Sequence, residues 1–327
     1  GLHNRRGKRH GAPRGRARNR YLRGESQRSR SRPLARRFTL QTMRQTRQKR
    51  AREAKDEIHF MNHKPVEIFS HGGGTQSAAI TALIVQGRLP KPGFVCIVDT
   101  ERERQTTWDY LDAVIRPALA GVGIEVHRIR KSQYGSKPEH GFDYLSHNGN
   151  TLLLPAFTSQ SDSFGKLSGF CSKTWKVETN DRFCREVLGV ESKRQKHWIG
   201  FSLDESRRAI RMMNGDDYKA GLIRFPLIHD VPLKRRAAIQ IVESMGWPTP
   251  PRSACWMCPN QGDHEWRDLK ANSPAEFAAA CELEKEVQKV DPFAWFHKSC
   301  IPLGEVDFTM PEDLFTDRAC SSGGCFT

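Results

Sequence analysis

The sequence predicts an α/β fold in which a parallel sheet with flanking helices is followed by a mostly helical C-terminal region with a cysteine cluster. Three observations predict it. Short apolar runs alternate with amphipathic stretches between residues 66 and 130, as in strands joined by crossover helices. A glycine triplet separates the first run from its helix, and a Cys-x-x-Cys pair lies in a proline-rich segment near residue 255. In such sheets, ligands bind at the carboxyl ends of the strands.

All of the excess positive charge lies in the first 60 residues. They hold 20 Lys and Arg against 4 Asp and Glu, which accounts for the formal net charge of +16 of the whole chain. We expect this tail to be disordered up to about residue 34 and to bind polyanions such as tRNA or DNA nonspecifically. Because the sequence begins at Gly1 and Met61 precedes the first strand, an alternative is that residues 1–60 are not native.

The glycine triplet lies within residues 67–84, which begin as an apolar run and continue as a helix of small residues. Glycine lets the backbone turn sharply and approach a ligand, and the N-terminus of the following helix favours an anion. The loop lacks the lysine of the G-x-x-x-x-G-K-[ST] pattern. The alternative is a tight turn without a ligand. The candidate anion-binding residues are Ser70, Gly72, Gly73, Gly74, Thr75, Gln76 and Ser77.

The second expected strand, residues 93–100, is a β-branched run that ends in Asp99 and Thr100. A helix over residues 104–120 and a third strand over residues 124–129 follow. Because Asp99 and Thr100 end a parallel strand, we expect them beside the glycine loop. The alternative for Asp99 is a helix N-cap.

Residues 131–165 are polar and contain several glycines, which predicts a flexible loop. Cys171 follows, close in sequence to Lys173 and Lys176. Positive neighbours lower the pKa of a thiol and make its sulfur a better metal ligand or nucleophile, so we expect a lowered pKa for Cys171. Taken alone, the pattern also fits a surface cysteine.

A further strand-like run, residues 197–201, leads into an acidic and basic segment. Asp204 and Glu205 are candidate ligands for Mg²⁺, and Glu205 can instead orient Arg208. Arg207 and Arg208 are candidates for neutralising phosphate or sulfate. The alternative is a capped helix start with an exposed salt bridge.

The Cys-x-x-Cys pair, Cys255 and Cys258, presents two thiols that can reach one metal site. Three interpretations stay open. A structural zinc would need two more ligands, such as Cys320 and Cys325, whereas a thioredoxin-type disulfide belongs to a different fold context. A [4Fe–4S] cluster would take its third thiol from Cys171. We favour the cluster because the three thiols of Cys171, Cys255 and Cys258 lie in segments that flank the expected anion site. The candidate fourth ligand is Cys325 or Cys320.

Together these motifs resemble the superfamily of PP-loop ATPases and phosphoadenosine phosphosulfate (PAPS) reductases, over about residues 64–327. Residues 72–77 are similar to its Ser-Gly-Gly-x-Asp-Ser pyrophosphate loop, although Gln76 replaces the aspartate. Residues 99–103 are similar to its Asp-Thr-Gly-x-Glu segment, although Glu101 replaces the glycine. The cysteine segments look like those of a phage and bacterial PAPS reductase-like group.

The resemblance implies a fold of the HUP/PP-loop type and an enzyme that binds an adenine nucleotide, ATP or PAPS, with Mg²⁺. It also implies a sulfur donor or reductant protein as a partner. The expected activity is sulfur transfer, such as ATP-dependent thiolation of a nucleic acid. The alternatives are a PAPS reductase in the narrow sense and a zinc-stabilised nucleotide-binding module tethered to nucleic acid by the tail. The residues implied are Asp99, Thr100 and Glu103 for the nucleotide and Lys176, Glu205 and Arg208 for catalysis.

We therefore expect three parts, which are a basic tail at residues 1–60, a nucleotide-binding α/β domain at 61–230 and a mostly helical region at 231–327. The sequence contains no apolar run of 18 residues and no secretory signal, so we expect no membrane contact and a cytoplasmic location. The nine cysteines are accordingly expected to be reduced thiols or metal ligands rather than disulfides.

Overall fold

A computed structural model describes residues 46–47, 64–138, 141–146, 149, 151–159 and 165–309. The chain divides into two units, residues 1–62 and 63–327. The expectations for the tail lie almost wholly outside the described residues, as do Cys320 and Cys325. The boundary expected at residue 230 stays a prediction. In the described part of the chain, no helix combines the length and the apolar character needed to cross a bilayer.

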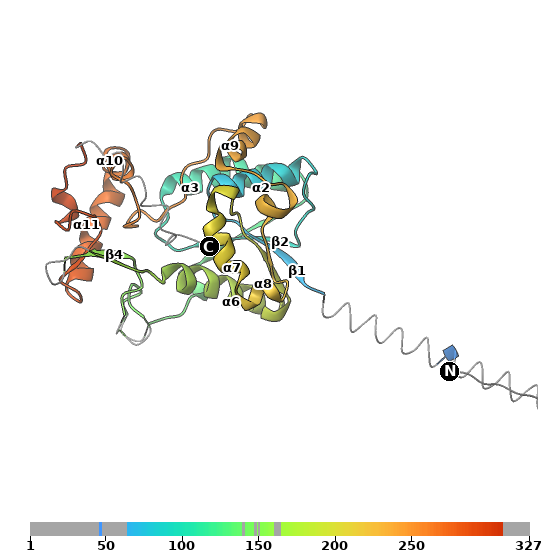
Figure 1. Ribbon diagram of the computed structural model, residues 1–327, viewed down its shortest axis with the longest axis horizontal. Helices are drawn as coiled ribbons and strands as arrows, with labels where there is room; N and C mark the ends of the chain where they lie inside the picture. The colour runs from blue at the N-terminus through green and yellow to red at the C-terminus, as the bar shows by residue number, and fades with distance from the viewer. Residues whose placement is uncertain are drawn as a thin grey trace, which may run out of the picture. The chain divides into compact units, whose positions relative to one another are not determined.

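A five-stranded parallel sheet forms the centre of the second unit (Figure 1), in the order β3-β2-β1-β6-β7. Its register pairs Ile68 of β1 with Phe94 on one side and with His197 on the other. The strand order reverses between β1 and β6, where open α/β sheets bind their ligands. The predicted fold class is confirmed. The strands are β1 (Val66–Ser70), β2 (Phe94–Asp99), β3 (Val126–Arg130), β6 (Gln195–Trp198) and β7 (Ile223–Arg224).

Helices cover both faces of this sheet because successive side chains of a strand point to opposite faces. Phe69 packs into the core that includes helix α2 (Thr75–Val85) and helix α9 (Arg235–Ser244). Its neighbour Ile68 packs into the core on the other face, which includes helix α6 (Glu178–Glu186).

The helix expected over residues 104–120 is confirmed as one continuous helical stretch. It consists of α3 (Gln105–Tyr110), a π-helical turn (Leu111–Ile115) and α4 (Arg116–Ala120). Short helices follow β3 and β6 near the site. They are α5 (Lys131–Tyr134), a π-helical turn (Ser172–Val177), two 3₁₀ turns (Ser192–Arg194 and Leu203–Glu205), α7 (Ser206–Met213), α8 (Asp216–Lys219) and a further π-helical turn (Pro226–Asp230).

The C-terminal region packs around a second core and is not purely helical. Helix α10 (Asp263–Asn272) packs against helix α11 (Pro274–Gln288) around Trp266 and Phe296. Beside it lies an antiparallel sheet of β5 (Gly165–Leu167), β4 (Ala156–Thr158) and β8 (Ala294–Trp295), and a 3₁₀ turn (Leu303–Glu305) ends the described chain.

The prediction of a flexible loop over residues 131–165 is wrong for much of its described part. That part contains α5 and β4, and β4 pairs with β8 from the far end of the chain. The physical reason is the apolar run before β4, since Leu154 and Ala156 are fully buried in the second core. Burial of this run holds the segment against the C-terminal region.

Candidate functional site

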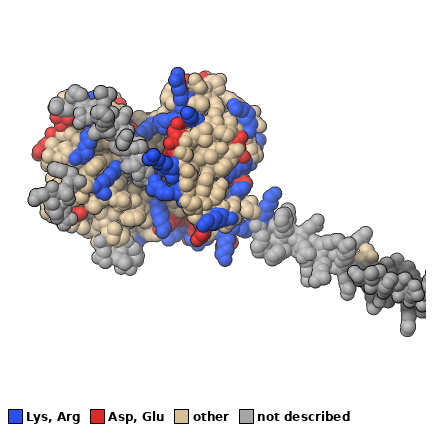
Figure 2. Space-filling model, viewed as in Figure 1, with Lys and Arg blue, Asp and Glu red and all other residues tan. Residues whose placement is uncertain are grey.

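A cleft of about 1110 Å³ opens beside the carboxyl ends of β1 and β6. Lys and Arg side chains gather near the middle of the face shown in Figure 2. Four of the residues predicted to bind the anion, the nucleotide or Mg²⁺ do not line the cleft, namely Gly73, Asp99, Thr100 and Arg207. The predicted residues that do line it are Ser70, Gly72, Gly74, Thr75, Gln76, Ser77, Glu103, Lys176, Asp204, Glu205 and Arg208.

The glycine loop is closely packed, and two of its own amides are already engaged. The Gly72 N–H donates to Ser77 Oγ at 2.9 Å, and the Gly73 N–H donates to His71 Nδ1 at 3.1 Å. Gly73 has a φ of +78°, and a Cβ there would lie 2.7 Å from Thr107 Cγ2. Only glycine fits this conformation and this space.

The free donors lie one step further along the chain, in the first turn of α2. Gly74 precedes this helix as its N-cap residue. The amides of Thr75, Gln76 and Ser77 have no intrahelical acceptor, and the described residues supply none. These amides, more than those of the glycines, are therefore available to an anion in the cleft.

His71 is a site residue that the sequence analysis missed. It is 3% exposed and lines the cleft, and burial lowers its pKa to about 3, which keeps the ring neutral. Because Nδ1 accepts from Gly73, the proton lies on Nε2, which has no partner among the described residues. Two further lining residues, Glu103 and Thr107, also have a buried oxygen without a partner. Buried polar atoms of this kind normally find a ligand or water.

Gln76 connects the loop to the segment after β6. Its side-chain amide donates to Glu205 at 2.9 Å, and the same carboxylate pairs with Arg208 at 2.5 Å. Glu205 thus supplies a negative charge beside position 76, where the resembling loop has aspartate. Asp204 accepts the backbone N–H of Arg235. Protein donors therefore already contact both candidate Mg²⁺ ligands, Asp204 and Glu205.

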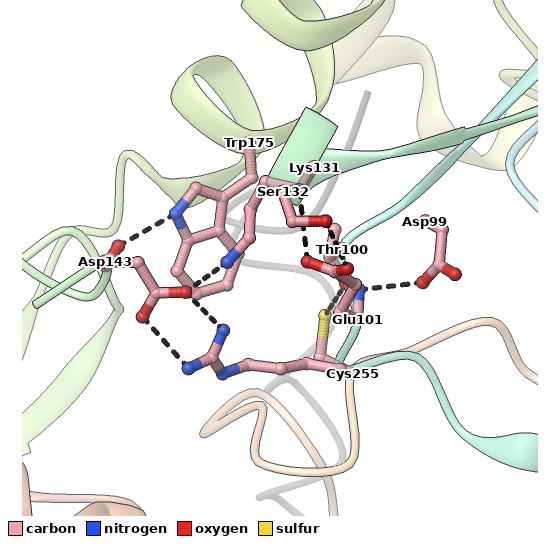
Figure 3. A network of polar contacts seen from close by, with 9 residues as sticks. Asp99, Thr100, Glu101, Lys131, Ser132, Asp143, Trp175 and Cys255 are labelled. Atoms are coloured by element: carbon pink, nitrogen blue, oxygen red, sulfur yellow. Dashed lines mark hydrogen bonds and ion pairs between the residues drawn. The ribbon is translucent and has the colours of Figure 1, made fainter. Parts of the chain in front are cut away.

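Asp99 is held by local contacts, but it is not the helix N-cap of its alternative interpretation, because the N-cap residue of α3 is Arg104. The Asp99 carboxylate accepts from the Glu101 N–H at 2.7 Å and from Arg128 at 2.6 Å, and Arg128 stacks on Trp108. Glu101 has a φ of 61°, the left-handed conformation that glycine adopts freely, at the position where the resembling motif has glycine. Figure 3 shows the Glu101 carboxylate beside Ser132, with which it forms a hydrogen bond of 2.7 Å.

Backbone pairing connects the end of β2 to the Cys-x-x-Cys segment. Glu103 and Cys255 form an antiparallel bridge, and the Trp256 N–H donates to the carbonyl of Arg102 at 2.8 Å. The Cys255 sulfur lies 3.5 Å from the Thr100 hydroxyl, as Figure 3 shows. This pairing brings Cys255 to the carboxyl edge of the sheet.

The three predicted cysteines converge on one small cavity. Cys171, Cys255 and Cys258 line a space of about 20 Å³ together with Trp175 and Lys176. Cys171 contributes from the start of the π-helical turn that precedes α6. Among the other cysteines, Cys96 and Cys184 lie in the core on the α6 face, while Cys281 and Cys300 are only partly buried.

Lys176 forms the wall between the cysteine cavity and the cleft. Its ammonium lies 2.7 Å from the Glu103 carboxylate, and both side chains are at least 85% buried. Burial alone would lower the pKa of Lys176, but the charge and hydrogen bond of Glu103 raise it. The lysine is therefore charged. Lys176 and Asn260 line both cavities.

The expected lowering of the Cys171 thiol pKa is wrong. Burial raises the pKa of Cys171 to about 11, and the opposing effect of Lys176 is smaller. The side chain of Lys173 is exposed. Burial also raises the pKa of Cys255 well above its usual value. These raised pKa values correspond to neutral thiols at neutral pH.

The three sulfurs that line this cavity are donors that both an iron–sulfur cluster and a zinc ion accept. No group of three or more Cys, His, Asp or Glu side chains in the described part of the chain is arranged to hold one metal ion. A tetrahedral zinc with bonds of about 2.3 Å requires thiolates about 3.8 Å apart, whereas a four-iron cluster spaces them more widely. The cavity of about 20 Å³ must expand to admit a cluster. Cys325, the candidate fourth ligand, lies outside the described residues.

No protein-family model and no curated protein sequence matches the chain. Among solved structures, the chain is similar to the U34-tRNA thiolase NcsA from Methanococcus maripaludis with its [4Fe-4S] cluster. The match has a TM-score of 0.35 and 14% identity, over 80% of this chain and 81% of that one. At this TM-score and identity the likeness assigns neither a family nor a function.

Proposed function

We propose that the protein is a nucleotide-dependent sulfur-transfer enzyme of the PP-loop type, with an adenine nucleotide in the cleft and a [4Fe–4S] cluster on Cys171, Cys255 and Cys258. The observation that carries the proposal is the shared wall, since Lys176 and Asn260 line both the cleft and the cysteine cavity. A single layer of side chains separates the two. Sulfur transfer to an activated substrate needs these two chemistries side by side.

The cleft supports nucleotide binding through its shape and its donors. A volume of about 1110 Å³ is ample for a nucleotide. The free amides of Thr75, Gln76 and Ser77 suit the phosphates, and Lys176 adds a buried positive charge on the side of the cysteines. Arg208 is paired with Glu205 and lies on the opposite side of the glycine loop, at the segment after β6.

The favoured reaction is adenylation followed by sulfur transfer. An oxygen of the acceptor attacks the α-phosphorus of ATP, the bond to the bridging oxygen breaks, and pyrophosphate leaves with the bonding electrons. The first turn of α2 is placed to hold the departing pyrophosphate, because its amides are fixed before the reaction. A sulfur donor then displaces AMP. The cluster, when bound, would supply an iron that can hold the sulfur.

Anaerobic purification followed by nucleotide binding tests this proposal. We expect a brown protein with iron and sulfide, binding of ATP in preference to PAPS, and isotope exchange between pyrophosphate and ATP when the acceptor is present. Candidate acceptors are tRNA and DNA, which the basic tail would attract. Binding of PAPS alone would instead favour the reductase alternative. Absence of binding of either nucleotide would contradict the proposal.

The metal site has a separate test with a matched control. Cys255→Ala and Cys258→Ala should remove iron and leave ATP affinity largely intact, because neither sulfur lies in the amide-lined part of the cleft. Cys281→Ala on α11 should keep both. Loss of nucleotide binding with retained metal would refute the division of roles.

A second candidate function has one observation in its favour. The cavity of about 20 Å³ is closer to the size of one ion than to that of a four-iron cluster. A colourless protein with one zinc per chain and no exchange activity would identify a zinc-stabilised nucleotide-binding module. The same metal analysis therefore separates the two candidates.

A further inference from the structure

Three hydrogen-bonded side chains lie along the cleft without a role in the proposed chemistry. Ser70, the last residue of β1, has its hydroxyl 3.0 Å from Nδ1 of His197 on the neighbouring strand β6. Nε2 of His197 lies 3.2 Å from the side-chain oxygen of Gln195. All three residues line the cleft. This hydrogen-bonded series of side chains thus connects the adjacent strands β1 and β6, between which the strand order reverses.

Gln195, at the end of this hydrogen-bonded series, determines which atom donates and which accepts in each hydrogen bond. Gln195 is 2% exposed, and its amide nitrogen donates to the backbone carbonyls of Val190 at 2.9 Å and Asp181 at 3.3 Å. Because a carbonyl only accepts, the nitrogen must face these two groups and the oxygen must face His197. His197 therefore donates from Nε2, which leaves Nδ1 as the acceptor of the Ser70 hydroxyl proton.

The histidine cannot readily reverse this order at neutral pH. Burial lowers the pKa of His197, so the ring is neutral and has one proton, which Gln195 binds. The third member is an amide, which cannot stabilise an imidazolium as a carboxylate does. This arrangement therefore orients Ser70 and does not activate it as a nucleophile.

Ser77 in the same cleft has the opposite hydrogen-bonding role from Ser70, because its hydroxyl is available as a donor. Its Oγ accepts the Gly72 N–H at 2.9 Å, and no described group accepts its hydroxyl proton. Ser77 therefore presents a donor in the first turn of α2, where an anion needs donors. Ser70 presents only lone pairs, which repel a phosphate oxygen and attract an O–H or N–H group.

We propose that Ser70 recognises the nucleoside part of the ligand by accepting a hydrogen bond from a neutral hydroxyl or amino group, while Ser77 and the α2 amides hold the phosphates. This inference rests on the proposed function, because it takes the ligand to be a nucleotide. His197 and Gln195 are positioning residues, since they act only through the Ser70 proton. The two serines thereby set the direction in which the nucleotide lies along the cleft.

Calorimetric binding of ATP and of inorganic pyrophosphate to the full chain tests the inference. Ser70→Ala should weaken ATP binding about tenfold, the loss of one hydrogen bond, and leave pyrophosphate binding unchanged. The matched variant Ser77→Ala should weaken both ligands by the same factor. Ser70→Ala weakening pyrophosphate as much as ATP would overturn the inference, as would unchanged ATP affinity.

Nucleotide analogues identify the group that Ser70 binds. ATP analogues that lack the 2′-hydroxyl, the 3′-hydroxyl or the base amino group are compared in the wild type and in Ser70→Ala. The analogue without the recognised group should bind the wild type about tenfold more weakly than ATP and lose nothing further in the variant. Further loss for all three analogues would contradict the inference alone. A wild-type chain that binds pyrophosphate but neither ATP nor PAPS would instead remove the proposed function with it.

Discussion

Glu103 and Cys255, separated by 152 residues in the chain, are joined by an antiparallel β-bridge at the carboxyl edge of the sheet. The Glu103 side chain also pairs with Lys176, which lies beside Cys171 in the same small cavity. One residue therefore connects the sheet, the Cys-x-x-Cys segment and the lysine between the two cavities.

Glu103→Gln should destabilise the fold by about 3 kcal/mol, because it leaves the buried Lys176 ammonium without its carboxylate. The double variant Glu103→Gln/Lys176→Met should be more stable than the sum of the single losses by about 2 kcal/mol. Urea unfolding of the four proteins measures this coupling. Glu286→Gln, at the exposed pair with Lys289, is the control and should unfold like the wild type. Additive single losses would show that Glu103 and Lys176 act independently.

Two glycines with the same φ allow the cost of backbone strain to be measured separately from the cost of a steric clash. Gly73 and Gly123 both have a φ of +78°, but only at Gly73 would a Cβ meet another atom, Thr107 Cγ2 at 2.7 Å. Gly123→Ala should cost about 1 kcal/mol, whereas Gly73→Ala should cost about 1 to 3 kcal/mol more and displace the loop from α2. Thermal unfolding and ATP affinity check both effects. Equal losses would mean that the loop yields to the added methyl group.

The fold was predictable because the spacing of apolar residues in the sequence follows which side chains are buried. Successive side chains of residues 66–70 pack into the two cores on opposite faces of the sheet, and residues 94–99 are buried on both faces. Both strands could therefore be predicted from the sequence. The apolar run that ends at Leu154 carried the same kind of signal, but surrounding polar residues obscured it. Strand β4 follows this run, and its partner strand β8 lies more than a hundred residues further along the sequence.

Local sequence patterns located the parts of the site that lie within one segment, whereas grouping Cys171 with Cys255 and Cys258 also depended on the resemblance. The loop at residues 72–77 could be located because glycines and a helix start stand next to each other in sequence. The Ser70–His197–Gln195 chain arises from strand register, since β1 and β6 pair with Phe69 beside Trp198. No local pattern encodes that register. His71 was missed for another reason, since its burial depends on tertiary packing and not on its neighbours in sequence.

Glu101 tests the cost of the left-handed conformation. Glu101→Ala keeps the φ of 61° and loses the hydrogen bonds to Ser132, whereas Glu101→Gly loses the same bonds and relieves the strain. Glu101→Gly should therefore be about 1 kcal/mol more stable than Glu101→Ala. Ser132→Ala removes one of these hydrogen bonds without changing residue 101. Denaturant unfolding ranks the variants, and an Ala variant as stable as the Gly variant would show that the turn has relaxed.

His71 predicts how stability depends on pH. Its pKa falls from 6.5 to about 3 on folding because of burial, so between these values the unfolded chain binds a proton that the folded chain does not. Stability should thus decrease as the pH falls from 6.5 toward 3, with a contribution from this residue of up to about 1.4 kcal/mol per pH unit. His71→Asn keeps an acceptor for the Gly73 N–H and removes the titrating ring. The variant should accordingly show a flatter decline in the free energy of unfolding over this range, measured by urea titration at each pH. Parallel declines in the two proteins would mean that the His71 ring reaches solvent and is protonated without unfolding.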